Sequence, residues 1–234
     1  HDVEPLSAEH FGLMEKSLAL MGQVGNDVLF IPVVHGTHLG HQTGLIRWVK
    51  DGNQYRPEFA ALQRYLDLYE KHCGPPSVIC LIVWKPQFGS HALFRGAQVK
   101  TREPIVVTQL DPATGGMSPL TAPMFGKPGS EVFLKSMIDG VRKIVRRRGW
   151  DERQLMLGQG FDSRPLQEAV DFFHKIAPKM RWTVFSHWSG DPGPKDGKLI
   201  VSGGMEVGYC EIVAGGVLPE LHPEYPDLPE YEFI

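Results

Sequence analysis

Hydrophobic and polar positions follow two patterns along this chain, and together they predict alternating strands and helices. Apolar residues recur at helical spacing over 9–25, 58–72 and 131–148, and over a shorter stretch at 166–176. Short apolar runs bounded by Gly, Pro or polar residues predict buried strands. These strands are expected at 27–34, 77–84, 104–110, from Gln154 onward, at 181–186, and more briefly at 198–202 and 209–213.

Strands that alternate with helices of this length imply βαβ units and a mainly parallel sheet. The number of units favours an α/β fold of the (β/α) TIM-barrel type. Eight full units usually need about 250 residues, and this chain has 234 and starts on a helix, so the barrel is expected to be incomplete. We expect residues 1–234 to form one barrel-like domain of a longer protein. A doubly wound open sheet is the alternative, although no GxGxxG or phosphate-loop motif is present where that fold would carry it.

Two polar stretches are expected to be loops. The first runs from His35 to Trp48 and is rich in Gly and His, and the second covers 111–129 and is rich in Gly and Pro. Long loops inside compact domains are often functional. We predict that Ser130 caps the helix that follows the second stretch.

The stretch Gly158-Gln159-Gly160-Phe161-Asp162-Ser163-Arg164-Pro165 marks the central candidate site. It follows a buried strand and precedes a helix, and in parallel α/β folds the chemistry lies at the carboxyl ends of strands. Asp162 is therefore the first candidate for a working carboxylate. Asp162 could instead cap the next helix and pair with Arg164, with Pro165 at the first helical position. One residue can do both.

Composition and charge narrow the classes of function. Hydrophobic residues make up 42% of the chain, charged residues 22%, and the formal net charge is −3. This is typical of a folded globular protein and gives no electrostatic reason to expect nucleic acid or an anionic membrane as a partner. No apolar stretch reaches the roughly 18 residues of a membrane span. The three cysteines form no CxxC pair, so a thiolate metal cluster is not indicated.

Polar and aromatic residues cluster directly after the predicted strands, where one pocket could collect them. Indole rings that stack on C–H faces, together with carboxylates and amides, are what carbohydrate recognition requires. Glycoside cleavage typically needs two carboxyl groups, and we select Asp162 and Glu206 as that pair. No cofactor is expected. The residues expected to contact a glycan are His38, Trp84, Gln159, Arg164, His187 and Trp188.

Three histidines in the first loop leave an alternative open. His35, His38 and His41 are spaced by three residues, and three imidazoles can ligate zinc. Their spacing matches no established metal motif, and local hydrogen bonding within a structured loop is the simpler explanation; direct contact with a polar ligand is the third. A metal-dependent hydrolase is therefore a rival hypothesis.

Several segments in this order resemble a bacterial family of glycoside hydrolases related to the family 123 β-N-acetylgalactosaminidases. The resemblance covers roughly residues 10–190 and implies a TIM-barrel catalytic domain. The segments that carry it are Gly25-Asn26-Asp27-Val28, Thr37-His38-Leu39-Gly40, Arg47-Trp48-Val49-Lys50, Tyr65-Leu66-Asp67-Leu68, Val83-Trp84-Lys85-Pro86 and Gly160-Phe161-Asp162-Ser163-Arg164-Pro165.

The resemblance implies a substrate-assisted mechanism. In it, the acetamido group of the substrate attacks the sugar carbon of the cleaved bond, an Asp orients that group, and the adjoining Glu is the acid. Asp162 falls where the Asp-Glu pair is expected, but position 163 is Ser. Either another carboxylate (Glu206, Asp191 or Glu211) supplies the proton, the reaction differs, or the domain binds carbohydrate without cleaving it. The resemblance also favours a periplasmic or extracellular location.

Overall fold

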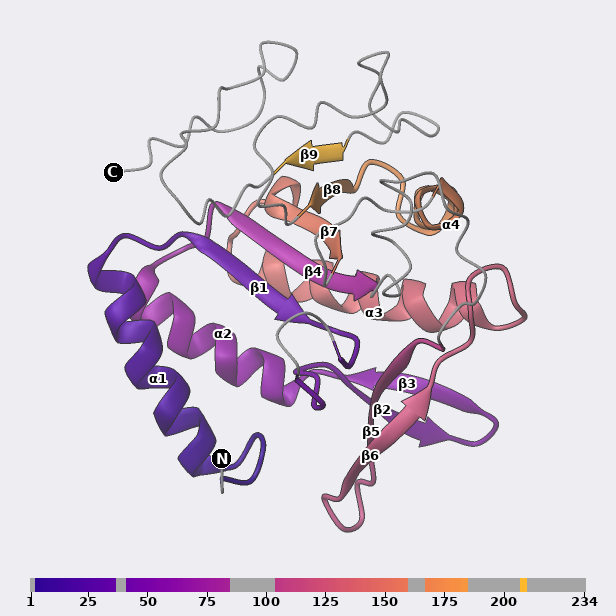
Figure 1. Ribbon diagram of the computed structural model, residues 1–234, viewed down its shortest axis with the longest axis horizontal. Helices are drawn as coiled ribbons and strands as arrows, with labels where there is room; N and C mark the ends of the chain where they lie inside the picture. Colours follow the sequence, from indigo (N-terminus) through magenta and orange to yellow (C-terminus); the bar gives the residue numbers. More distant parts are fainter. Residues whose placement is uncertain (1–2, 37–40, 85–103, 160–166, 185–206, 210–234) are drawn as a thin grey trace, which may run out of the picture.

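The computed structural model describes residues 3–36, 41–84, 104–159, 167–184 and 207–209, which form two sheets and the helices that cover them (Figure 1). In the larger sheet the strand order follows the chain, β1-β4-β7-β8-β9, and every adjacent pair is parallel. Its strands are β1 (Val28–Pro32), β4 (Val78–Trp84), β7 (Leu155–Gln159), β8 (Arg181–Val184) and β9 (Val207–Tyr209).

The helices confirm the predicted pattern to within a few residues. They are α1 (Ala8–Gln23), α2 (Ala60–Cys73), α3 (Ser130–Arg147), α4 (Gln167–Ile176) and the 3₁₀ turn η2 (Glu152–Gln154). α3 forms because buried residues recur every three or four positions from Phe133 to Val145, which makes one continuous apolar face. Gly149, at φ 72°, follows its end, a backbone conformation that glycine adopts without strain. The predicted cap of α3 is wrong: Gly129 is the N-cap, and the Ser130 hydroxyl donates to the Lys127 carbonyl.

A second sheet lies beside the carboxyl ends of the parallel strands and has the order β3-β2-β5-β6 (Figure 1). Its strands are β2 (Arg47–Asp51), β3 (Gln54–Glu58), β5 (Val106–Leu110) and β6 (Met117–Thr121). Two antiparallel hairpins, β2–β3 and β5–β6, are joined where β2 runs parallel to β5. Both predicted loops therefore contain or border strands that the apolar pattern did not indicate.

The predicted barrel is wrong, whereas the α/β class and the parallel sheet are confirmed. In the described part of the chain, β1 and β9 each pair with one neighbour, so the larger sheet is open. The strand expected at 104–110 is the reason for part of the difference, because β5 pairs with β2 and β6 in the second sheet instead of joining the parallel one. The strand order also lacks the reversal of a doubly wound sheet.

One hydrophobic core unites both sheets. Ile79, Leu81 and Leu157 of the parallel strands are completely buried, as the unbroken apolar run of β4 predicted. Trp48 of β2, also completely buried, stacks on Phe133 of α3 with ring centroids 4.9 Å apart and an interplanar angle of 2°. The second sheet is thus fixed to α3 by aromatic packing. No helix in the described part of the chain is long and apolar enough to span a membrane.

Candidate functional site

The carboxyl ends of three parallel strands lie in register at one edge of the larger sheet. Pro32 of β1 pairs with Ile82 of β4, and Trp84 at the end of β4 pairs with Gln159 at the end of β7. This register aligns the points at which the chain leaves each strand. In open parallel sheets this edge is where ligands bind.

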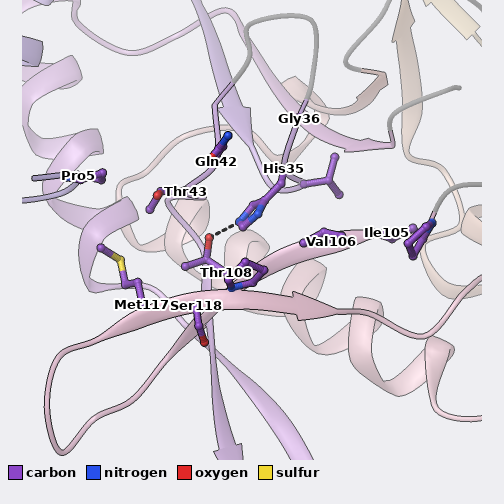
Figure 2. A pocket seen from close by; sticks show the side chains of 13 residues that line it. Pro5, His35, Gly36, Gln42, Thr43, Ile105, Val106, Thr108, Met117 and Ser118 are labelled. Atoms are coloured by element: carbon purple, nitrogen blue, oxygen red, sulfur yellow. Dashed lines mark hydrogen bonds between the residues drawn. The ribbon is translucent and has the colours of Figure 1, made fainter. Parts of the chain in front are cut away.

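A cavity of about 550 Å³ lies at this edge, between the segment that follows β1 and the β5–β6 hairpin (Figure 2). Its volume falls in the range of roughly 300–1,000 Å³ that is usual for small-molecule sites. The polar residues that line it are His35, Gln42, Thr43, Thr108 and Ser118, and its apolar lining comes from Pro5, Val34, Pro104, Ile105, Val106, Met117 and Pro119. Among the described residues that line the cavity, none is Asp, Glu, Lys or Arg.

Thr108 forms the floor of the cavity and connects three chain segments. Its side chain is 1% exposed, and its Oγ1 lies 2.7 Å from Nε2 of His35. The same oxygen accepts a hydrogen bond from the backbone N–H of Gly44 at 2.7 Å. The backbone N–H of His35 donates to the carbonyl of Val106 at 2.8 Å. His35 is therefore held against β5 by both its backbone and its side chain, as Figure 2 shows for the side chain.

The two described histidines of this loop are held toward their neutral forms. Burial lowers the pKa of His35, and the proximity of His41 lowers it further. Burial also lowers the pKa of His41, while a hydrogen bond with the backbone of Val34 acts in the opposite direction. The cause is desolvation, which disfavours a charged imidazolium. At neutral pH the cavity therefore presents an uncharged imidazole beside a hydroxyl group.

The metal hypothesis gains no support from the described residues. Nowhere among them do three His, Cys, Asp or Glu side chains approach one another closely enough to hold a metal ion. His35 is engaged with Thr108 through Nε2, and His38 lies outside the described residues.

The structure brings two of the sequence-predicted site residues together. Trp84 and Gln159 are register partners at the carboxyl ends of β4 and β7. The other predicted positions lie outside the described residues: His38, Asp162, Arg164, His187, Trp188 and Glu206. So do the alternative acids Asp191 and Glu211.

Sequence reasoning missed the cavity residues Gln42, Thr43, Thr108 and Ser118. Thr108 stood in a predicted strand, where a lone hydroxyl carries no functional signal. Its 1% exposure and its contact with His35, 73 residues away in sequence, arise because the segment that follows β1 lies against β5, where the His35 N–H donates to the Val106 carbonyl. The hairpin that carries Ser118 had a weak local signal, because Gly115 and Gly116 of the Asp111–Gly116 turn separate two β-rich runs.

The fold and the site define an α/β protein whose described residues form an open parallel sheet with a cavity of ligand-binding size beyond the end of β1. The family model "Glycoside hydrolase 123, catalytic domain" matches residues 1–189 of the chain. The chain belongs to this family, and its function is glycoside hydrolase-like, with a glycan as the substrate. No curated protein matches the chain.

Proposed function

We propose that this chain hydrolyses a glycosidic bond of a glycan, with Asp162 and Glu206 as its two working carboxyl groups. The observation that carries the proposal is the register of the parallel sheet. β7 lies between β4 and β8, and Asp162 follows its last residue, Gln159, by three positions. The family match includes this segment. Open parallel sheets bind their ligands outside the carboxyl ends of the strands, which supports a working role for an Asp that follows β7 so closely.

The expected substrate contacts follow the same edge. Trp84 and Gln159, as register partners at two adjacent strand ends, support a common binding surface for the glycan. In the proposal, Trp84 and Trp188 stack on sugar faces, whereas His38, Gln159, Arg164 and His187 bind hydroxyl groups.

The proposed reaction requires one carboxyl group to be protonated and the other ionised. One protonates the leaving oxygen, and the other acts on the opposite side of the cleaved bond, either directly at the sugar or through a water molecule. Ser163 occupies the position where the resemblance implies a Glu, so the acid must come from elsewhere in the chain. Glu206 is our choice, with Asp191 and Glu211 as the other candidates.

The test compares Asp162→Asn with Asp139→Asn, a matched substitution of an exposed aspartate on α3 that pairs with Lys135. Purified full-length variants are assayed on a panel of aryl glycosides and natural oligosaccharides. Loss of a carboxyl group that acts in the transition state is expected to lower kcat by roughly 10²–10⁴-fold, whereas Asp139→Asn should keep wild-type turnover. Unchanged turnover in Asp162→Asn would overturn the assignment. Parallel Glu206→Gln, Asp191→Asn and Glu211→Gln variants identify the second carboxyl group.

Because position 163 is not Glu, a second candidate function is a carbohydrate-binding domain without catalytic activity. The same panel of glycosides distinguishes this binding domain from a hydrolase. Sugar binding by calorimetry without turnover of any glycoside supports the binding domain and contradicts the hydrolase.

A further inference from the structure

We propose that Thr108 is a positioning residue for the hydrolase reaction. Its hydroxyl group holds both flanks of the loop that leaves the carboxyl end of β1, with His35 on the outgoing flank and Gly44 on the returning flank. The described flanks of this loop are residues 35–36 and 41–44. The inference rests on the proposed hydrolase function, but it does not depend on which carboxyl groups carry the reaction.

A single oxygen atom joins the two flanks. Oγ1 of Thr108 lies 2.7 Å from Nε2 of His35, and it accepts a hydrogen bond from the backbone N–H of Gly44, also at 2.7 Å (Figure 2 shows the contact with His35). A threonine hydroxyl offers one proton and two lone pairs, so these two contacts take up most of its capacity. Because Thr108 is 1% exposed, bulk water competes little for the hydroxyl, and its partners fix one another.

The returning flank is closely packed at Gly44. A Cβ atom on this glycine would lie 3.2 Å from the carbonyl oxygens of both Val33 and Ile46, which is closer than such an atom normally approaches. The turn at Gly44 therefore lies directly against the end of β1, where it has little room to shift. Its N–H group is directed at the Thr108 hydroxyl from this confined position.

The backbone of the loop flanks is also held by contacts that do not involve the hydroxyl. Val33 and Ile46 are completely buried, and the backbone N–H of His35 donates to the carbonyl of Val106 at 2.8 Å. Loss of the hydroxyl should therefore leave the fold intact. Its specific effect should be to release the imidazole of His35 and to leave the loop N–H without its acceptor.

The loop leaves β1 at the edge where open parallel sheets bind their ligands. The register of Pro32 with Ile82, and of Trp84 with Gln159, places the ends of β4 and β7 at the same edge. Loops at such an edge carry function while a rigid scaffold positions them. A displacement of about 1 Å can lower the rate of a reaction by roughly 10²-fold. Thr108 belongs to β5 of the second sheet, and it is the scaffold group that bonds to both flanks.

The test measures steady-state kinetics of full-length variants, at a temperature at which circular dichroism shows each of them to be fully folded. Thr108→Val removes the hydroxyl at nearly constant volume and should lower kcat by about ten-fold or more with little change in KM. Thr108→Ser keeps the hydroxyl and should stay within roughly three-fold of the wild type. Thr121→Val is the matched control at an exposed position of β6 in the same sheet, and it should keep wild-type kcat.

A double variant distinguishes positioning from a purely structural role. Thr108→Val combined with His35→Gln should lose no more kcat than the more impaired single variant, because groups that act as a unit are not additive. The imidazole NMR signals of His35 should change in Thr108→Val and return in Thr108→Ser. Wild-type kcat in folded Thr108→Val, failure of Thr108→Ser to keep activity, or multiplication of the two single losses overturns the proposal.

The positioning role and the carboxyl assignment fail separately. If Asp162→Asn remains fully active while Thr108→Val loses turnover and Thr108→Ser keeps it, the positioning role stands and the carboxyl assignment falls. If Asp162→Asn is inactive while folded Thr108→Val has wild-type turnover, the carboxyl assignment stands and the positioning role falls.

A wild type that cleaves no glycoside overturns the hydrolase function, and the variants are then compared by calorimetry for glycan affinity. Affinity lowered about ten-fold in Thr108→Val and kept in Thr108→Ser supports positioning of a binding loop. Equal affinities of the wild type and Thr108→Val, or no binding of any glycan by the wild type, overturn the positioning role as well.

Discussion

Gly22 of α1 lies so close to His72 of α2 that a Cβ atom on the glycine would stand 2.0 Å from the His72 carbonyl oxygen. The obstacle is backbone, which cannot move aside as the end of a flexible side chain can. Gly12, on the same helix, has nothing within 4 Å of the equivalent position. The contact between the two helices therefore depends on a glycine at one position and not at the other.

This pair of glycines gives opposite predictions for the same substitution. Gly22→Ala should lower the free energy of unfolding by roughly 1–3 kcal/mol, because the helices must separate to admit the methyl group. Gly12→Ala should raise it by roughly 0.5–1 kcal/mol through helix propensity. Urea unfolding followed by circular dichroism measures both. Equal effects of the two substitutions would contradict the close packing of α1 on α2.

Arg148 connects the end of α3 to α2. Its guanidinium lies 2.5 Å from Asp67 and 2.8 Å from Glu70, and it donates to the carbonyl of Gln63 at 3.1 Å. The Arg148 side chain is 14% exposed, whereas those of Asp67 and Glu70 are 69% and 41% exposed, so solvent screens the two ion pairs in part. Arg148→Ala should lower the free energy of unfolding by about 1–2 kcal/mol.

Two further substitutions test whether the geometry of Arg148 matters. Arg148→Lys should recover only part of the loss, because an ammonium group cannot reproduce the planar fork of donors. Arg147→Ala, at the exposed neighbouring position, should change stability by less than about 0.5 kcal/mol. Chemical denaturation of the three variants measures the series, and equal losses for Arg147→Ala and Arg148→Ala would refute the bridging role.

Glu58 joins the β2–β3 hairpin to the start of α2. Its Oε2 accepts from Nε of Arg47 at 2.9 Å, and its Oε1 accepts from the backbone N–H of Ala60 at 2.6 Å. Glu58→Ala should cost roughly 1–3 kcal/mol, since it leaves the partly buried Arg47 without its partner. Glu58→Gln should cost less, because the amide oxygen can still accept a hydrogen bond. Thermal unfolding at low and high salt measures the difference between the two variants.

His35 should make stability depend on pH. Burial and the proximity of His41 lower the pKa of His35 in the folded protein below the ordinary value of 6.5. The unfolded chain then binds more protons than the folded chain as the pH falls below about 6.5. The contribution of His35 to stability is complete above this pH and decreases as the pH falls toward the lowered pKa.

Denaturant unfolding of wild type and His35→Gln at pH 7.5 and pH 5 tests this dependence. The glutamine keeps a polar group near Thr108 but does not titrate. The variant should therefore lose less stability between the two pH values than the wild type. An equal loss in both proteins would show that His35 does not contribute.

The helices and the parallel strands were predictable because local pattern encodes them. The apolar run of β4 and the repeat from Phe133 to Val145 in α3 each contain the information that specifies the element. The β2–β3 hairpin was missed although its two turn residues, Gly52 and Asn53, are a known hairpin signal. Polar residues dominate both of its strands, and β3 is largely solvent-accessible, so no apolar alternation marked it.

The residues of the candidate site also include some that the sequence predicted and some that it did not. Trp84 and Gln159 were chosen because each follows a recognisable buried strand, and their register confirms that they stand at the same edge. Gln42, Thr43, Thr108 and Ser118 were missed because nothing local distinguishes them from other polar residues. Their common cavity forms where the segment that follows β1 contacts the β5–β6 hairpin. These two segments precede and follow β4 in the chain.

The sequence by itself determined the α/β class, most of the helix and strand positions, and a resemblance to glycoside hydrolases that the family match confirms. Tertiary structure alone decided that β5 leaves the parallel sheet for a second one, which leaves the larger sheet open within the described residues. It also decided that Thr108 faces His35. The physical reason is that side-chain periodicity reports only which face of an element is buried. The choice of strand partner depends on backbone hydrogen bonds between residues far apart in the chain.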